Sequence, residues 1–460
     1  MSGSDGNSGS GGARVESLRV RGPARALAGD VTVPGDKSIG HRAVLFAAIA
    51  NGHATVRGLS GGEDNRSTIG VLRALGVAIR DVAHGVVEVD GRGLDGLRAA
   101  AGDLDCGNSG TSMRLFAGLL ASRPFASRLV GDQYLHARPM KRVVEPLTQM
   151  GARLSGQPGG KPNEVYPPLE IAAATARLHG IRWESRVASA QVKSAIVLAA
   201  LATDGPSTIV EPERSRDHTE RMLAHMGAPL TVDGLAVTVD PRGWDGRLAA
   251  RDLLVPGDLS SAAFLLGAAA VVPQSRVVVR GVGVNPTRTG VIDALRAMGA
   301  RIEVADERLV GGEPVADLAC SAEGGALRAI RIDGELAVRA IDELPLLAAV
   351  AAHADGETRI ADAAELRVKE SDRIAATAAM LRALGVEVEE HPDGLTVRGG
   401  RGARGGVVES HGDHRIAMAG AICALGAAGE THIRDTKNVA TSFPTFASVL
   451  AMLGADLESA

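Results

Sequence analysis

The feature that most constrains the fold of this 460-residue chain is a segment that recurs six times along it. In each copy an apolar helical pattern ends at a glycine, and a short alternating run typical of a β-strand follows. The marker glycines are separated by 69 to 86 residues and are Gly76, Gly151, Gly227, Gly299, Gly385 and Gly454. Because a recurring segment of this kind indicates a repeated supersecondary unit, the sequence predicts six α/β modules of about 70 residues.

Each module is predicted to contain the same parts. Apolar residues three and four positions apart, as at Ile374, Ala378 and Leu381, predict a helix before the marker glycine. The glycine is expected to take the left-handed conformation that ends a helix. A second, Ala-rich helix lies upstream in residues such as 43–50, 195–202 and 344–352. Since these upstream runs are apolar nearly all round, we expect them to be buried.

The six modules group as three plus three. The segments 33–36 and 255–258 both read Val-Pro-Gly-Asp, and each precedes an apolar helix. Because Pro-Gly marks turns, we interpret both segments as crossings between two domains. The first domain is predicted to span 37–254, and the second 14–33 plus 258–460, with hinge strands at 33–36 and 255–258. Residues 1–13 form a Gly/Ser/Asn-rich stretch that we expect to be a flexible tail.

Composition excludes several classes of protein. The net charge of −4 and the ten aromatic residues argue against a nucleic-acid partner. The apolar stretches, such as Ala262–Val272, are shorter than the roughly 17–25 residues of a membrane span. Three widely spaced cysteines indicate neither a disulfide framework nor a zinc site, and they fit a reducing cytoplasm.

Two motifs suggest ligands but lack the context that would support them. Gly91–Gly96 matches the GxGxxG pattern of dinucleotide-binding folds, which also requires an acidic residue about 20 positions later. Asp103 and Asp105 come too early, so we do not predict nucleotide binding. His411 and His414 have no accompanying carboxylate shell, and we predict no metal and no cofactor.

Cations recur next to the expected starts of helices. They are Lys37, Arg42, Arg114, Arg138, Arg216, Lys369, Arg373 and Arg415. A cation at a helix N-terminus opposes the macrodipole by about 0.3–1 kcal/mol, so one such residue would be a solvated salt bridge, but repetition requires a cause. Bound phosphate or carboxylate groups supply that cause, and the small-residue loop Gly107–Thr111 offers further backbone donors.

Two carboxylates lie among these cations and are candidates for acid–base chemistry. Asp342 precedes the apolar helix expected at 344–352, and Glu370 lies between Lys369 and Arg373. Each has a structural alternative, because Asp342 is equally suited to cap that helix and Glu370 to form an ion pair.

The segments around these residues resemble the 5-enolpyruvylshikimate-3-phosphate synthases, the enolpyruvyl transferases of the shikimate pathway. The resemblance runs from Val33 to Pro444 and includes VPGDKSIGHR, GNSGTSMRL, SAQVKSA, RDHTERML, VPGDLSSAAF, NPTRTG, AIDELP, LRVKESDRI, GDHRIAMA and ATSFP. The residues of these motifs are closer to those of the second class of that family. The resemblance implies a two-domain inside-out α/β barrel with three modules in each domain. It also implies transfer of the enolpyruvyl group of phosphoenolpyruvate to the 5-hydroxyl of shikimate-3-phosphate, with release of phosphate.

The resemblance also implies roles for individual residues. Asp342, Glu370 and Lys37 match catalytic positions, Asp342 as the base near the reacting hydroxyl and Glu370 at the methylene carbon. Positions expected to bind shikimate-3-phosphate are Lys37, Ser38, Arg42, Ser189, Gln191, Ser215, Arg216, Asp342 and Lys369. Positions expected to bind phosphoenolpyruvate are Lys37, Gly110, Arg138, Gln191, Arg373 and Arg415. Gly110 lacks a Cβ, which would leave room for glyphosate beside phosphoenolpyruvate.

Two alternatives remain open on the sequence. One is enolpyruvyl transfer to a nucleotide sugar, in an enzyme that usually carries a loop cysteine. The other is a non-catalytic module that holds an anion in the same cleft. We further expect a monomer in the cytoplasm with no membrane or nucleic-acid partner.

Overall fold

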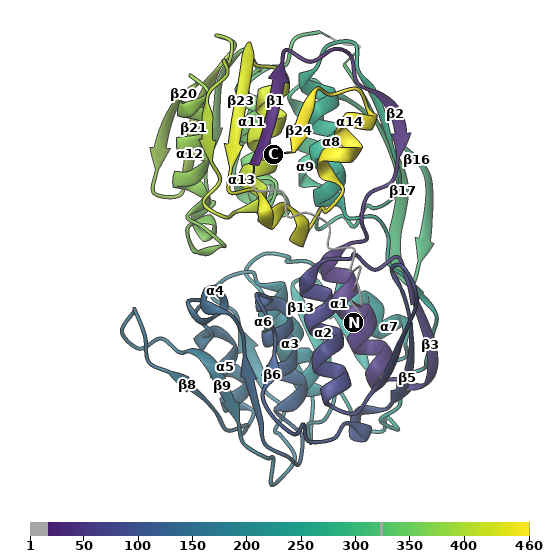
Figure 1. Cartoon of the computed structure of the whole chain (residues 1–460). Helices are drawn as coiled ribbons and strands as arrows, with labels where there is room; N and C mark the ends of the chain where they lie inside the picture. The colour runs from purple at the N-terminus through teal and green to yellow at the C-terminus, as the bar shows by residue number, and fades with distance from the viewer. Residues whose placement is uncertain (1–16, 323–324, 460) are drawn as a thin grey trace, which may run out of the picture.

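A computed structural model describes residues 17–322 and 325–459. The flexible tail expected at 1–13 lies outside these residues. Within them, strands pair into six four-stranded sheets, and the chain folds into two α/β bodies (Figure 1). The mixed parallel and antiparallel pairing inside each sheet agrees with a two-domain α/β fold built from repeated modules.

The first body contains the elements between the two Val-Pro-Gly-Asp segments. Its helices are α1 (Lys37–Ile49), α2 (Glu63–Ala74), α3 (Gly110–Leu120), α4 (Gln133–His136), α5 (Lys141–Gln149), α6 (Ala190–Ala200) and α7 (His218–His225). Its strands are β3 (Asn51–Arg57), β4 (Ala78–Ala83), β5 (Val86–Arg92), β6 (Leu104–Asp105), β7 (Ser127–Val130), β8 (Leu154–Gln157), β9 (Tyr166–Ile171), β10 (Arg182–Glu184), β11 (Ser207–Val210), β12 (Leu230–Asp233), β13 (Ala236–Val239) and β14 (Leu253–Leu254). They pair in the orders β14-β3-β5-β4, β6-β7-β9-β8 and β10-β11-β13-β12.

The second body combines the first described residues with the C-terminal part of the chain. Its helices are α8 (Leu259–Val271), α9 (Gly290–Ala297), α10 (Gly334–Arg339), α11 (Leu344–Ala351), α12 (Arg373–Ala383), α13 (His414–Leu425) and α14 (Phe446–Met452). Its strands are β1 (Ser17–Gly22), β2 (Ala28–Val31), β15 (Arg276–Gly283), β16 (Arg301–Val310), β17 (Glu313–Ser321), β18 (Arg331–Ile332), β19 (Gly356–Ile360), β20 (Glu387–His391), β21 (Gly394–Gly399), β22 (Val407–Glu409), β23 (Gly429–Arg434) and β24 (Leu457–Ser459). They pair in the orders β16-β17-β15-β2, β18-β19-β21-β20 and β22-β23-β1-β24, so the purple strands β1 and β2 lie among green and yellow elements (Figure 1).

The marker glycines adopt the backbone conformation that the repeat predicts. All six have positive φ, between 75° and 107°, and each follows the end of a helix. This region of φ is strained for residues with a Cβ, so glycine stops the helix and turns the chain towards the next strand. The prediction of left-handed helix ends is therefore confirmed.

The Ala-rich helices are buried, as predicted. Every residue of α8 is buried, and so is every residue of α11. In the first body α3 and α6 approach so closely that a Cβ on Gly118 would lie 2.1 Å from the backbone oxygen of Ala195. Small side chains thus let the helices pack against one another inside each body, where larger ones would hold them apart.

The GxGxxG segment is a turn in the structure. Strand β5 ends at Arg92, and only the short 3-10 turn η1 (Leu94–Gly96) follows it. A dinucleotide site needs the N-terminus of a helix at this place, and the structure has none there. Two further 3-10 turns, η2 (Ala364–Val368) and η3 (Lys437–Thr441), lie in the second body.

Candidate active site

The site is built at the starts of helices, where aspartate caps stand directly before cations. Asp36 accepts a hydrogen bond from the Ile39 amide at 2.9 Å and begins α1, whose first residue is Lys37. The same arrangement begins α12, where Asp372 precedes Arg373, and in α13 the cap Asp413 is followed by His414 and then by the cation Arg415. Each capping carboxylate offsets the unfavourable interaction between the following cation and the helix macrodipole. The helices can therefore present cations at their N-termini.

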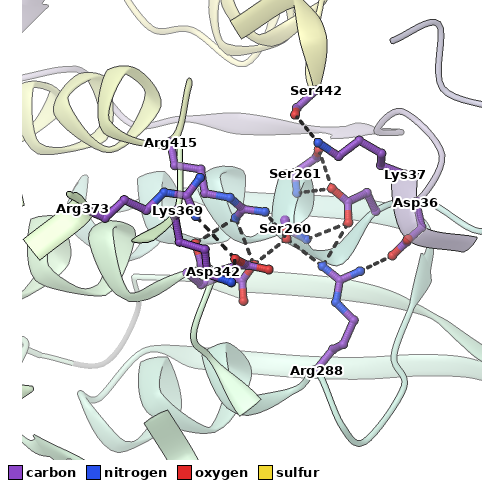
Figure 2. Close-up of polar contacts among 12 residues, drawn as sticks. Asp36, Lys37, Ser260, Ser261, Arg288, Asp342, Lys369, Arg373, Arg415 and Ser442 are labelled. Atoms are coloured by element: carbon purple, nitrogen blue, oxygen red, sulfur yellow. Dashed lines mark hydrogen bonds and ion pairs between the residues drawn. The ribbon is translucent and has the colours of Figure 1, made fainter. Parts of the chain in front are cut away.

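Lys37 reaches from the first body towards residues of the second. Its Nζ lies 2.9 Å from Asp64 Oδ2. It also donates to Ser442 Oγ at 3.5 Å (Figure 2). Burial lowers the pKa of Lys37, but the carboxylates of Asp64 and Glu370 outweigh it and hold the pKa above its ordinary value. Lys37 therefore stays protonated and suits a phosphate or carboxylate ligand.

Asp342 lies where cations from both bodies meet. Arg216, which precedes α7 in the first body, donates to its carboxylate. Arg373 Nη1 and Lys369 Nζ of the second body lie 3.4 Å and 3.8 Å from Asp342 Oδ1 (Figure 2). Burial would raise the pKa of Asp342, but Arg216 and Lys369 hold it well below its usual range. Asp342 is therefore an ionised carboxylate that can accept a proton.

Glu370 and Asp413 hold the Arg373 guanidinium. Arg373 Nη2 donates to Glu370 Oε2 at 2.6 Å, and Nε donates to Asp413 Oδ2 at 2.8 Å. The arginine is only 1% exposed, so these carboxylates compensate a buried charge. Burial would raise the pKa of Glu370, but Arg373 and Arg138 hold it well below its usual range.

Arg415 is fixed by the start of α11. Its Nη1 donates to the Asp342 backbone oxygen at 2.8 Å and to Glu343 Oε1 at 3.2 Å. Its Nη2 donates to Ser260 Oγ at 3.2 Å (Figure 2). These three bonds fix the plane of a guanidinium whose side chain is 12% exposed.

In the first body a group of polar residues surrounds the start of α3. Gln191 Nε2 donates to Thr111 Oγ1 at 2.9 Å, and its Oε1 accepts from Arg114 Nη1 at 2.6 Å. A Cβ on Gly110 would lie 2.7 Å from Arg114 Nη1 and 3.1 Å from Arg138 Nη1. Two guanidinium groups thus converge on a glycine at a helix N-terminus, which is a favourable place for an anion.

Ser189 and Ser215 are held by one buried carboxylate. Glu211 accepts from the Ser189 amide at 3.0 Å and from Ser215 Oγ at 2.7 Å. Lys193 Nζ lies 2.7 Å from Glu211 and 2.8 Å from Glu220, and all three side chains are buried. The ion-paired Glu211 therefore holds the backbone of Ser189 and the side chain of Ser215.

The Arg42 guanidinium is hydrogen-bonded to other residues of the first body. Its nitrogens donate to Thr219 Oγ1 at 2.7 Å, to Ser194 Oγ at 2.9 Å and to the Ser38 backbone oxygen at 2.9 Å. The residue is 2% exposed, and burial lowers its pKa to about 10. It joins α1 to α6 and α7 and holds the Ser38 backbone by its carbonyl oxygen.

The two structural alternatives for the carboxylates have different outcomes. The capping alternative for Asp342 is wrong, because Glu343 occupies the N-cap position of α11 and the Asp342 side chain contacts cations instead. The ion pair expected for Glu370 is confirmed, since Glu370 pairs with Arg373. That pair does not decide whether Glu370 also transfers a proton.

Several residues of this site escaped the sequence analysis. They are Asp64, Lys193, Glu211, Glu220, Ser260, Arg288, Glu343, Asp413 and Ser442. Most of them stand inside the segments that carry the resemblance, such as Glu343 in AIDELP and Asp413 in GDHR. Only their partners, distant in sequence, reveal what they do.

The structure gives no sign of metal ligation at the histidines. No group of three or more His, Cys, Asp or Glu suited to a metal ion occurs within 17–322 and 325–459. His414 is buried at the start of α13, and burial lowers its pKa to about 3, so it is neutral. All three cysteines are buried, and burial raises the pKa of Cys320 and of Cys423 to about 12.

Comparison with known proteins gives a consistent result. Residues 21–450 match the family model of EPSP synthase (3-phosphoshikimate 1-carboxyvinyltransferase). The 3-phosphoshikimate 1-carboxyvinyltransferase of Geobacter sulfurreducens is 51% identical over 93% of this chain and 97% of its own. That of Pelobacter propionicus is 52% identical over 93% of this chain and 96% of its own. The solved structure of EPSP synthase from Acinetobacter baumannii superposes with a TM-score of 0.86 at 41% identity, covering 96% of this chain and 99% of that one. The chain belongs to the EPSP synthase family.

Proposed function

We propose that this chain transfers the enolpyruvyl group of phosphoenolpyruvate to the 5-hydroxyl of shikimate-3-phosphate and releases phosphate. The observation that carries the proposal is the convergence of Arg216 and Lys369, from different bodies, on the Asp342 carboxylate. Each substrate carries a phosphate and a carboxylate, so the pair brings several negative charges to one place. The lysine and arginine groups from both bodies match that demand.

In the proposed reaction Asp342 takes the proton from the 5-hydroxyl of shikimate-3-phosphate, and the hydroxyl oxygen attacks C2 of phosphoenolpyruvate. Glu370 delivers a proton to the methylene carbon, which gives a tetrahedral intermediate. When the carbon–oxygen bond to phosphate breaks, Glu370 takes a proton back from the new methyl group, which restores the carbon–carbon double bond and gives the enolpyruvyl ether. Lys37 stays protonated and balances charge on the departing phosphate.

In this scheme substrate binding raises the pKa values of the two carboxylates. Arg373 and Arg138 depress the pKa of Glu370 in the free protein. When the anionic groups of phosphoenolpyruvate contact these arginines, they offset the positive charge, and the pKa of Glu370 rises towards the range of a proton donor. Shikimate-3-phosphate acts in the same way on Asp342, through Arg216 and Lys369.

We propose the following division of the binding residues. Shikimate-3-phosphate contacts Lys37, Ser38, Arg42, Ser189, Gln191, Ser215, Arg216, Asp342 and Lys369. Phosphoenolpyruvate contacts Lys37, Gly110, Arg138, Gln191, Arg373 and Arg415. The contacts of the Ser189 amide and the Ser215 hydroxyl with Glu211 support their place in the first set, since one buried carboxylate holds both residues.

Two domains and a hinge are part of the same proposal. Buried apolar residues form one cluster between Ile39 and Val255, and another from Leu18–Val31 together with Leu259–Ala455. This division supports domains at 37–254 and at 14–33 plus 258–460, with hinge strands at 33–36 and 255–258. Closure about such a hinge would exclude water from the reacting groups.

The test is phosphate release by the purified chain with each substrate alone and with both. We expect release only when both are present. Release with phosphoenolpyruvate and a nucleotide sugar would instead support the alternative transferase, which the three buried cysteines disfavour. Binding of both ligands without release would support an anion-binding module.

Three further expectations stay predictions. We expect a monomer, which light scattering on the purified protein would measure. We expect turnover without an added cofactor, which an assay after dialysis against a chelator would measure. We expect a cytoplasmic location without nucleic-acid or membrane partners; among the described residues no helix combines the length and apolarity needed to cross a membrane.

A further inference from the structure

The two crossings between the bodies are bonded to each other. The Asp36 amide donates to the Pro256 oxygen at 2.8 Å, and the Asp258 amide donates to the Pro34 oxygen at 2.9 Å. Each aspartate then caps the helix that follows, Asp36 on α1 and Asp258 on α8. Two buried carboxylates therefore lie beside the crossing, one at the start of each body's first helix.

Arg288 contacts both carboxylates. It lies between β15 and α9 in the NPTRTG segment, to which the proposed function gives no role. Its Nη1 bonds to Asp36, and its Nη2 lies 3.2 Å from Asp258 Oδ1 and donates to Ser260 Oγ at 2.6 Å (Figure 2). The residue is only 4% exposed. One guanidinium thus joins the helix caps of the two bodies.

The same guanidinium is linked to Arg415 through Ser260. Ser260 Oγ bonds to Glu343 and accepts from Arg415 Nη2 at 3.2 Å. Arg415 also donates to Glu343 and to the Asp342 backbone oxygen (Figure 2). A continuous set of buried and partly buried polar contacts therefore runs from the start of α1, beside Lys37, to the start of α13.

A charged, planar group is needed at this position. Burial lowers the pKa of Arg288, but Asp36 and Asp258 outweigh it and raise the pKa above its ordinary value. A lysine would keep the charge, but its single nitrogen cannot reproduce the forked contacts with Asp36 on one side and Asp258 and Ser260 on the other. Charge alone would therefore not replace Arg288.

We propose that Arg288 is a positioning residue that holds the start of α1 against the start of α8 and, through Ser260, orients Arg415. This inference rests on the proposed function, in which Lys37 and Arg415 bind phosphoenolpyruvate. Ser189 and Ser215 belong to a separate network around Glu211 and make no contact with Arg288. Arg415 is proposed to bind phosphoenolpyruvate alone, whereas Lys37 is proposed to bind both substrates, so the role of Arg288 concerns phosphoenolpyruvate more than shikimate-3-phosphate.

The test compares Arg288→Lys and Ser260→Ala with Arg301→Lys, a control on the exposed edge of β16. Steady-state kinetics give kcat and the KM for phosphoenolpyruvate, calorimetry gives the Kd for shikimate-3-phosphate alone, and thermal unfolding gives Tm. For Arg288→Lys and for Ser260→Ala we expect the KM for phosphoenolpyruvate to rise about tenfold, the effect of losing one charge-assisted hydrogen bond. We expect the Kd for shikimate-3-phosphate to change less than the KM for phosphoenolpyruvate, and the control to match the wild type.

The double variant separates positioning from loss of stability. Because both changes interrupt one chain of contacts, Arg288→Lys with Ser260→Ala should raise this KM little beyond either single change. An unchanged KM in folded single variants, an equal loss of both substrates, or additive effects in the double variant would overturn the role of Arg288. If Arg288→Lys does not fold, Ser260→Ala decides alone, by the presence or absence of the selective rise in KM. A wild-type chain that releases no phosphate with both substrates would contradict the proposed function itself, which is a different result.

Discussion

Arg216 and Asp342 form an ion pair between the two bodies, although they are 126 positions apart in the sequence. The aspartate also faces Lys369 and Arg373, so the pair lies at the centre of the candidate site. The pKa of a carboxylate in the second body is therefore lowered by a cation of the first body.

Replacing Asp342 with Asn should lower kcat by about 100- to 10,000-fold, because an amide cannot accept the proton of the 5-hydroxyl. The measurement is steady-state phosphate release, with circular dichroism to establish that the variant is folded. Glu335→Gln, which removes an exposed carboxylate from α10, is the matched control and should leave kcat unchanged. Turnover of Asp342→Asn at the wild-type rate would remove Asp342 from the mechanism.

Replacing Glu370 with Gln should lower kcat by a similar factor, about 100- to 10,000-fold, because the amide cannot transfer a proton at the methylene carbon. The Arg373 guanidinium keeps its bond to Asp413, so phosphoenolpyruvate binding should weaken much less than turnover. Calorimetric binding and phosphate release measured on the same preparation would separate the two effects. A loss confined to binding would assign Glu370 a purely structural pairing with Arg373.

Replacing Gly110 with Ala should raise the KM for phosphoenolpyruvate while the fold stays intact. The new Cβ would meet the outer nitrogens of Arg114 and Arg138, which can move aside but then no longer converge on the helix start. We also expect glyphosate to inhibit the wild type in competition with phosphoenolpyruvate, and the variant less strongly. Gly102→Ala, with open space around its Cβ, is the control. Equal kinetics in both variants would show that the start of α3 does not bind this substrate.

Replacing Lys193 with Met should destabilise the protein by about 3–5 kcal/mol, because it leaves Glu211 and Glu220 buried together without a cation. Urea unfolding would measure the loss, with Lys161→Met on the exposed surface as the control. A change below about 1 kcal/mol, as expected for exposed pairs, would mean that the network is solvated in the native protein.

The acid stability of the chain should depend on Asp36. Burial would raise its pKa, but Arg288 and other cations lower it from 3.8 to about 2. Since the folded pKa lies below the unfolded one, the charged carboxylate stabilises the fold above about pH 4, and this contribution is lost as the pH falls towards 2. The shift corresponds to about 2 kcal/mol in the free energy of unfolding.

Wild type and Asp36→Asn should therefore differ more in unfolding free energy at pH 6 than at pH 2.5. Glu335→Gln, measured at the same two pH values, again serves as the control. A constant difference between wild type and Asp36→Asn across this range would contradict a depressed pKa at Asp36.

The sequence alone determined the features that depend on local chemistry. Gly76 and its five counterparts end helices with positive φ because they lack a Cβ, and that requirement is visible without any partner. The Ala-rich composition of 344–352 indicated a buried helix for a similar reason, since such a run has no polar face to expose. Cations such as Lys37 and Arg415 could be recognised as site residues because their positions at helix starts are unfavourable without an anion.

Only the tertiary structure decided which charges meet. Asp342 was equally compatible with capping α11, and its real partner Arg216 comes from the other body. Arg288 and Lys193 gave no local signal, because an arginine or lysine in isolation reads as a solvated side chain, and burial against distant carboxylates is what gives each a role. Periodicity and backbone conformation act over a few residues, whereas ion pairs in a folded core join positions that only chain topology brings together.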